Sequence, residues 1–280
     1  MTEHPSAAFG DYGQILSISN QRPGIEEGTL NLAQLYPDPH DRERFETRLR
    51  LFLDCDPSLS EVIWREGSDQ LWFRTESLVP SALDDRPPLL LVVGNPAPHS
   101  VLSGLPFSYE GDHREHRFWA ALSATGFLQF GPESHQIESW EERNKARKEA
   151  LFSLRYDSPF RLGIAVYFSM PSPAAAPGWA GVAGLRRLFG ARALGIIATA
   201  EQERLSQIVK DFHHGAGAVI AFQRDAYEGL RLPTGAPYLV RTVLSSLLEA
   251  RCKFDSEILL FGGPPTRLMR GASARLRSLA

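Results

Sequence analysis

The chain has 280 residues, of which 43% are hydrophobic and 22% are charged. This composition is typical of globular proteins and argues against global disorder, because enough apolar side chains are present to form a large core. The formal net charge of −3 excludes a strongly basic protein, although a nucleic-acid binder needs only a local basic face.

Cysteine usage and hydropathy exclude further classes. Cys55 and Cys252 form no CxxC pair, which excludes zinc ribbons and four-cysteine iron–sulfur clusters. We expect two free thiols rather than a disulfide. No stretch reaches the ~18 apolar residues of a membrane span, and the first residues lack the pattern of a secretory signal. We therefore expect a soluble, cytoplasmic protein without a membrane partner, a metal or a cofactor.

The N-terminal section shows one clear helical pattern. Residues 1–30 are rich in glycine, serine and polar side chains, and we expect them to wrap loosely over the body of the protein. Residues 41–53 predict an amphipathic helix. The apolar residues that recur at helical spacing in it are Phe45, Leu49, Phe52 and Leu53.

A hairpin pattern follows the helix. The apolar runs 62–64 and 71–73 flank a Gly67-Ser68-Asp69 turn, which predicts two paired strands. The helix and the hairpin together suggest that residues 1–85 form an N-terminal extension packed on the core.

The character of the sequence changes after Arg86-Pro87-Pro88. Four apolar runs then predict strands buried in a parallel sheet; they are 89–93, 162–168, 218–222 and 257–261. Helical patterns alternate with them, at 113–125, 199–212, 224–230 and 238–251. This alternation predicts an α/β domain over residues 86–280, a three-layer α/β/α sandwich with a central, mostly parallel four-stranded sheet.

Binding sites of such sheets gather in the loops beyond the carboxyl ends of the strands. The loops to examine here are 94–112, 169–180, 223–225 and 262–268. The first of them reads Gly94-Asn95-Pro96-Ala97 and continues to Leu105-Pro106-Phe107, and Arg117-Phe118-Trp119 comes next.

In these segments the sequence resembles the uracil-DNA glycosylase superfamily, and its mismatch-specific branch in particular. That family has a Gly-x-Asn-Pro-Gly loop after a strand, then Gly-x-Pro-Phe, then an Asn-Arg-Phe-Trp helix start. The three segments follow in the same order, and Ala218–Phe222 with Asp225-Ala226-Tyr227 is similar to the third strand and its helix. The resemblance covers about residues 89–268.

The resemblance implies the roles of several residues. Asn95 would orient the attacking water, and His99 would replace electrostatically a histidine that the family places near its C-terminus. The base would be held by Gly94, Ala97, Phe107 and Ser169. DNA phosphates and the duplex would be contacted by Gly263, Pro264, Pro265, Thr266, Arg267 and Leu268. The implied partner is double- or single-stranded DNA, bound by a monomer.

The chemistry is consistent with these residue types. Cleavage of an N-glycosidic bond passes through an oxocarbenium-like sugar, so a site needs a flipped base, an oriented water and stabilisation of the leaving base. The amide of Asn95 is no useful base, and catalysis would depend on orientation. The alternative is that Asn95-Pro96 only forms a turn.

Other positions also have two interpretations. Ala97 lies where uracil-specific relatives have a bulky tyrosine that excludes C5 substituents, so the pocket would admit larger bases; alternatively, a small residue suits a tight loop. Phe107 would stack on the extruded base or belong to the core. Ser169 would read the base edge. The arginines after Ile258 form a DNA-facing patch or a solvated helix face.

We therefore expect a monofunctional DNA glycosylase acting on a modified or mismatched pyrimidine. A bulky cytosine of phage DNA, hydroxymethylated or glucosylated, would place the protein in antiviral defence. The alternatives are a general uracil or mismatch repair enzyme and a catalytically weak DNA-binding module of the same fold. An unrelated hydrolase is disfavoured because the chain lacks a Gly-x-Ser-x-Gly elbow and a phosphate-binding glycine loop.

Overall fold

The computed structural model describes residues 10–109, 115–124, 128–131, 137, 139–231 and 258–263. The chain divides into two compact units. Unit 1 comprises residues 1–77, 95–104 and 168–204, and unit 2 comprises residues 78–94, 105–167 and 205–280. Each unit is therefore assembled from three separate stretches of chain.

Unit 1 is built on an antiparallel ladder. Its strands are β1 (Gly10–Tyr12), β2 (Leu16–Arg22), β3 (Gly24–Asn31), β4 (Ile63–Glu66) and β5 (Gln70–Leu78). They follow the order β1-β2-β3-β5, with β4 also paired to β5. The register pairs Leu30 with Leu71 and Gly28 with Phe73. The Phe73 ring lies so close to Gly28 that a Cβ there would be 2.2 Å from it, so only glycine fits this position.

The helices of unit 1 are α1 (Leu32–Leu35), α2 (Pro39–Asp54), α3 (Leu59–Val62), α4 (Pro98–Ser103), α8 (Gly181–Phe189) and the first part of α9 (Ala191–His213). Asp38 caps α2, because its side chain accepts a hydrogen bond from the His40 amide and satisfies one of the donors that a helix start leaves unpaired. The buried ring of Phe45 stacks on Phe189 of α8, so the two helices pack against each other.

Unit 2 contains a parallel ladder. Its strands are β6 (Pro88–Val93), β7 (Arg161–Val166), β8 (Gly217–Ala221) and β9 (Ile258–Gly262), in the order β7-β6-β8-β9. Its helices are α5 (Arg117–Ala124), α7 (Trp140–Phe152), the end of α9 and α10 (Arg224–Arg231).

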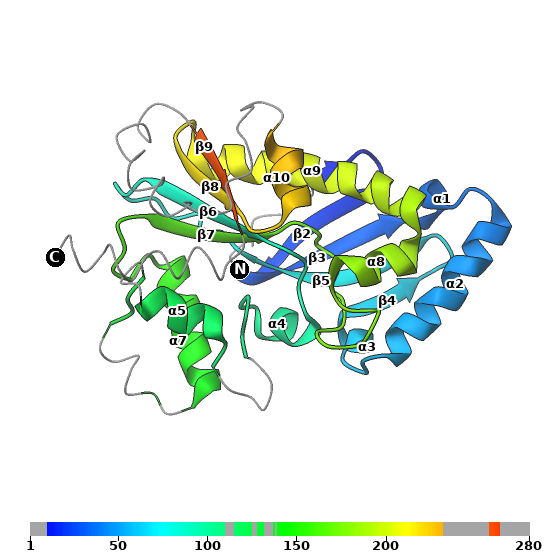
Figure 1. Ribbon diagram of the computed structural model, residues 1–280, viewed down its shortest axis with the longest axis horizontal. Coiled ribbons are helices and arrows are strands. Elements are labelled where there is room, and N and C mark those ends of the chain that lie inside the picture. The colour runs from blue at the N-terminus through cyan, green and yellow to red at the C-terminus, as the bar shows by residue number, and fades with distance from the viewer. Residues whose placement is uncertain are drawn as a thin grey trace, which may run out of the picture. The chain divides into compact units, whose positions relative to one another are not determined.

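The two faces of this parallel ladder are covered by different helices. Leu91 of β6 shares one core cluster with Trp119 of α5 and Leu151 of α7. On the other face, a Cβ at Gly163 would lie 3.1 Å from both Leu90 and the ring of Phe212 in α9. Figure 1 shows α5 and α7 on one side of β6 and β7 and α10 on the other. Unit 2 is thus a three-layer α/β/α arrangement.

The α/β class that the sequence predicted is confirmed, but the predicted sheet is wrong in size and direction. The structure has nine described strands, parallel and antiparallel, instead of four mostly parallel ones. Three of the five additional strands are β1 to β3, which residues 10–31 form rather than a loose wrap, and the other two are β4 and β5 of the predicted hairpin. The buried apolar residues of β1 to β3 alternate with polar ones, so no continuous apolar run marks these strands; the buried residues are Leu16, Ile18, Ile25 and Leu30.

Most of the other predicted helices and strands are present in the structure. The helix over 41–53, the hairpin and the four apolar strands are present, and α10 matches the pattern at 224–230. The pattern at 113–125 becomes α5, which begins at Arg117, and the pattern at 199–212 is part of the longer α9. The helix predicted over 238–251 lies outside the described residues. Among the residues described, no helix is long and apolar enough to span a membrane.

Candidate functional site

The carboxyl ends of the parallel strands open into a common edge of unit 2. The Gly94 carbonyl accepts a hydrogen bond of 2.7 Å from the Tyr167 amide, and the Gly263 amide donates to the Ala221 carbonyl at 3.2 Å. The ladder therefore continues one residue past the strands, and the loops after β6, β7, β8 and β9 start at the same edge, where sites of parallel sheets gather.

Gly94 has a specific neighbour at this edge. A Cβ on Gly94 would lie 2.2 Å from Nε2 of Gln223, the second residue after β8. The glycine thus allows the Gln223 amide to lie directly against the backbone of the loop. Gln223 is half-buried and was not singled out from the sequence, because a lone glutamine after a strand has no distinctive pattern.

Asn95 follows Gly94 and belongs to unit 1. Its Nδ2 donates a hydrogen bond of 2.7 Å to Oγ of Ser172. The Ser172 amide in turn donates to the Pro96 carbonyl at 3.0 Å. Within the described part of the chain, Asn95 Oδ1 accepts no hydrogen bond. The amide is therefore held by its nitrogen and presents its oxygen as an acceptor.

Ala97 marks the start of α4. Its carbonyl accepts hydrogen bonds from the amides of Ser100 and Val101, at 3.0 and 3.1 Å. Its backbone is extended, with φ −93° and ψ 151°, a conformation that any residue adopts. The backbone therefore does not by itself require a small side chain, and the admission of larger bases at Ala97 stays a prediction. His99 lies on α4, where it is half-buried.

Phe107 has a strained backbone. Its φ is +57°, a left-handed conformation that is rare for bulky residues and costs about 1–2 kcal/mol. The ring is partly buried, stacks on Phe118 with a centroid distance of 4.3 Å, and contacts His116 at 4.9 Å. The sequence left base stacking and core packing open for Phe107, and its half-exposed ring is consistent with both.

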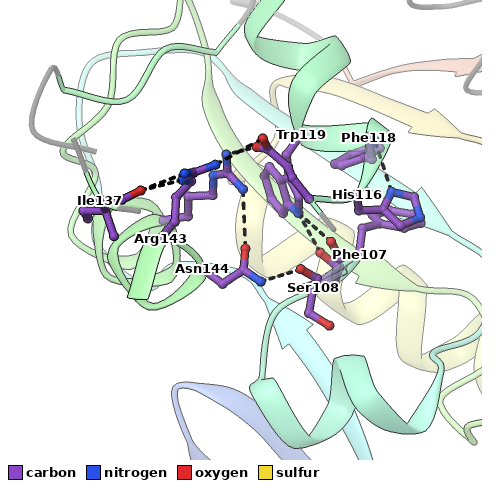
Figure 2. A network of polar contacts seen from close by, with 11 residues as sticks. Phe107, Ser108, His116, Phe118, Trp119, Ile137, Arg143 and Asn144 are labelled. Atoms are coloured by element: carbon purple, nitrogen blue, oxygen red, sulfur yellow. Dashed lines mark hydrogen bonds and ion pairs between the residues drawn. The ribbon is translucent and has the colours of Figure 1, made fainter. Parts of the chain in front are cut away.

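Side chains of α5 and α7 hold the backbone on either side of Phe107 (Figure 2). The indole Nε1 of Trp119 donates to the carbonyls of Pro106 and Phe107, at 3.1 and 3.0 Å. The buried Asn144 donates from Nδ2 to the Ser108 carbonyl. These hydrogen bonds stabilise the conformation that the residue would otherwise avoid. We call this set of contacts the Phe107 clamp; it comprises Trp119 and Asn144 with the carbonyls of residues 106, 107 and 108.

Behind the clamp lies a charged network, part of which Figure 2 shows. Arg147 donates to Oδ1 of Asn144 at 3.4 Å and forms an ion pair with Glu115. Arg143 contacts the same carboxylate at 3.4 Å and donates to the Ile137 carbonyl at 2.7 Å. Burial lowers the pKa of Arg147, and Glu115 opposes this effect. The network orients Asn144, because its oxygen is fixed by a guanidinium while its nitrogen binds the loop.

Ser169 is fully buried in unit 1. Its amide and its hydroxyl both donate to Oε1 of Glu201, at 2.6 and 2.5 Å, and Arg204 contacts the other carboxylate oxygen at 2.6 Å. Arg204 also acts on Glu26 of β3: burial raises the pKa of this carboxyl, and the positive charge of Arg204 opposes the rise. The Ser169 hydroxyl hydrogen is thus used within the protein, and base reading by Ser169 stays a prediction.

The predicted DNA-contacting loop is described only at its first residue. Gly263 is held at the edge of the ladder by its bond to Ala221. Pro264, Pro265, Thr266, Arg267 and Leu268 lie outside the described residues. Their contact with DNA stays a prediction.

Metal ligands do not converge in the part of the chain that is described: it holds no group of three or more His, Cys, Asp or Glu side chains placed to bind an ion. Comparison of the sequence with protein-family models and with curated proteins finds no match.

Sequence reasoning missed three residues that contact predicted ones: Ser172 beside Asn95 in unit 1, and Gln223 and Asn144 beside Gly94 and the Phe107 loop in unit 2. Each is a single polar residue with no motif around it. Ser172 lies between Pro171 and Pro173 in the loop after β7. Prolines fix the backbone around the serine, and this is the one sequence signal that could have drawn attention to it.

Proposed function

We propose that the protein is a monofunctional DNA glycosylase that excises a modified or mismatched pyrimidine. The observation that carries the proposal is the amide of Asn95, whose nitrogen is bound by Ser172 and whose oxygen stays available as an acceptor. An oriented acceptor at this position suits a water molecule that attacks C1′ of the sugar. The bond from C1′ to the base nitrogen breaks, and the base leaves with the bonding electrons.

An amide takes up no proton at neutral pH, so the proposal assigns orientation rather than base catalysis to Asn95. A transition state with oxocarbenium character needs little activation of the attacking water. Correct placement of the reacting groups alone gives large rate accelerations. The proton of the attacking water goes to solvent or to the departing base. This assignment is consistent with a loop fixed by a buried serine.

Two further observations support the substrate class. The extended backbone of Ala97 does not require a small residue, so a missing tyrosine there is better explained by space for a C5 substituent. Phe107 presents a half-exposed ring on a backbone that two side chains hold in a strained form, and strain of this kind clusters at functional sites. We include bulky cytosines, hydroxymethylated or glucosylated, in the proposed substrates and antiviral defence in the proposed role.

The test is base release from defined duplexes. Oligonucleotides carrying uracil, mismatched thymine, hydroxymethylcytosine or its glucosylated form are incubated with the protein, and abasic sites are detected as alkali-labile breaks. We expect cleavage of at least one duplex, reduced by at least about 100-fold in Asn95→Ala. Ser103→Ala is the matched control, because it removes a hydroxyl from α4 of the same segment.

Two results would contradict the proposal. Absence of base release from every duplex, with binding to DNA retained, would favour the DNA-binding module. Base release that persists in Asn95→Ala would keep the glycosylase activity but reject Asn95 as its centre.

A further inference from the structure

Ser172 connects two parts of unit 1 through one oxygen. Its Oγ lies 2.7 Å from Nδ2 of Asn95 and 2.8 Å from the amide nitrogen of Gly181, the first residue of α8. Ser172 is 2% exposed, so water does not compete for this oxygen. The contact with Asn95 joins residues that are 77 positions apart in the chain.

Two hydrogen bonds from Nδ2 fix the position and the orientation of the Asn95 side chain. The Gly181 amide can only donate, and it therefore uses one lone pair of Oγ. The second lone pair accepts the Nδ2 hydrogen of Asn95. The Ser172 hydroxyl could also donate to the oxygen of a reversed amide, so this contact fixes the position of the side chain but not which end faces the serine. The Pro96 carbonyl, which can only accept, receives a second hydrogen bond from Nδ2 at 3.5 Å, and this contact places the nitrogen inward and the oxygen outward.

The loop around Ser172 has little freedom to rearrange. Pro171 and Pro173 flank it and are both buried, and each fixes its own φ angle. The Ser172 amide is bound to the Pro96 carbonyl at 3.0 Å. Gly181 has φ +65°, a left-handed conformation that favours glycine. In this conformation its amide donates to Oγ of Ser172. The serine is thus fixed from three directions.

We propose that Ser172 is the positioning residue of Asn95, and that together with the Pro96 carbonyl it makes the Asn95 side chain an acceptor toward the substrate water. This inference rests on the proposed function for its catalytic meaning, but the orientation of the amide is measurable without any substrate. Ser172 itself need not touch DNA or base.

The first test follows the Asn95 amide directly. The chain has four asparagines, Asn20, Asn31, Asn95 and Asn144, so selective ¹⁵N labelling yields four side-chain amide signals, and Asn95→Ala assigns one of them. We expect one Asn95 Nδ2 proton to exchange with solvent about 5- to 13-fold faster in Ser172→Ala than in the wild type, because a net hydrogen bond of about 1–1.5 kcal/mol is lost. Ser172→Thr keeps the oxygen and restores slow exchange; Ser103→Ala leaves it unchanged.

The second test uses base release from the duplex that the wild type cleaves best. Ser172→Ala lowers kcat about 10-fold or more and leaves KM unchanged, because orientation of the water is lost while base binding is kept. Ser172→Thr recovers most of kcat. If the alanine variant does not fold, Ser172→Cys serves in its place, since sulfur is a weak acceptor in a side chain of similar shape.

A third test exchanges the amide for a base. In Asn95→Asp the Ser172 hydroxyl donates to the new carboxylate, which favours its charged form. The rate of base release then acquires a rising limb with pH that the wild type lacks. The midpoint of this limb lies at higher pH in the double variant with Ser172→Ala, a shift that a purely structural role of the serine would not produce.

The possible failures are distinguishable. Fast exchange of the Asn95 amide in the wild type, or exchange and kcat both unchanged in Ser172→Ala, would overturn the inference whether or not base is released. A protected amide that Ser172→Ala exposes, in a protein that releases no base, would support the orientation and reject the glycosylase.

Discussion

The interiors of the two units differ in what fills them. Unit 1 buries acidic and basic groups in strand β5 and helix α9: Glu76, Glu201 and Arg204 are each no more than 3% exposed. The core cluster of unit 2 consists of hydrocarbon and aromatic side chains around parallel strands, with the Phe107 clamp at one side. The stability of unit 1 thus depends on the protonation of buried carboxyls, whereas the buried ionisable side chains described in unit 2, tyrosines aside, are basic: Arg147, Arg161 and His213.

This difference bears on the candidate site, whose Asn95 loop belongs to unit 1. Arg204 illustrates how finely balanced the buried charges are. Burial disfavours its charged form, but the neighbouring Glu201 and Glu26 outweigh this effect and hold its pKa above the usual value. A buried charge that loses its partner is strongly destabilising. Conditions that alter these charges should therefore disturb unit 1.

The largest expected effect is the pH dependence caused by Glu76. Burial raises the pKa of its carboxyl to about 8, and Oε2 has no hydrogen-bond partner. The folded state therefore holds a proton that the unfolded state releases above pH ~4.5. Stability is full below that pH and falls as pH rises to about 8, by about 4 kcal/mol in total. Urea unfolding at several pH values measures this slope.

Glu76→Gln provides the comparison for this prediction. The glutamine has nearly the same shape and is neutral in both states, so the fall in stability between pH 4.5 and 8 should be absent from the variant. The variant is then more stable than the wild type at pH 8. Parallel slopes for both proteins would show that Glu76 is charged in the folded state.

The second effect concerns unit 2 and the Phe107 clamp. Trp119→Phe removes the indole donor from two carbonyls and leaves a small cavity at a fully buried position. We expect a loss of about 3 kcal/mol that is equal at pH 5 and pH 8, because no titrating group is removed. Denaturant unfolding of the variant at both pH values checks it, and a pH-dependent loss would break the contrast between the units.

The smallest effect distinguishes two roles of Ser169. Ser169→Ala removes one hydrogen bond to the buried Glu201 carboxylate, and we expect a loss of about 2 kcal/mol without any change in which base is released. Thermal unfolding and the duplex panel together measure both quantities. A variant of unchanged stability with an altered base preference would instead return Ser169 to the base-reading role that the sequence implied.

Much of unit 2 could be predicted from the sequence. Continuous apolar runs such as Leu89–Val93 identify strands buried on both faces, and the end of such a strand locates Gly94 and Asn95 at the edge where a site forms. Unit 1 could not be predicted in this way. Its strands alternate buried and polar residues over short lengths, and Glu76 and Thr75, both buried in β5, resemble surface residues when only their type is known.

The contacts that fix the site were beyond reach for a different reason. Asn95 could be singled out because it belongs to a local motif, whereas its partner Ser172 is distant in the chain and has no motif of its own. The strain at Phe107 was equally hidden, since a phenylalanine gives no sign of a left-handed backbone. Local patterns predict elements, and pairings between distant residues require the fold.

Unit 1 is completed only by residues 168–204, and this order has a consequence for how the protein is made. During synthesis the Asn95 loop leaves the ribosome long before Ser172 and α8, so it remains without its partner while nearly 80 further residues are added. A truncated chain that begins at residue 86 keeps the whole Asn95 motif but lacks the antiparallel strands of its unit. Such a fragment would contain the Asn95 motif without the residues 1–77 that complete its unit.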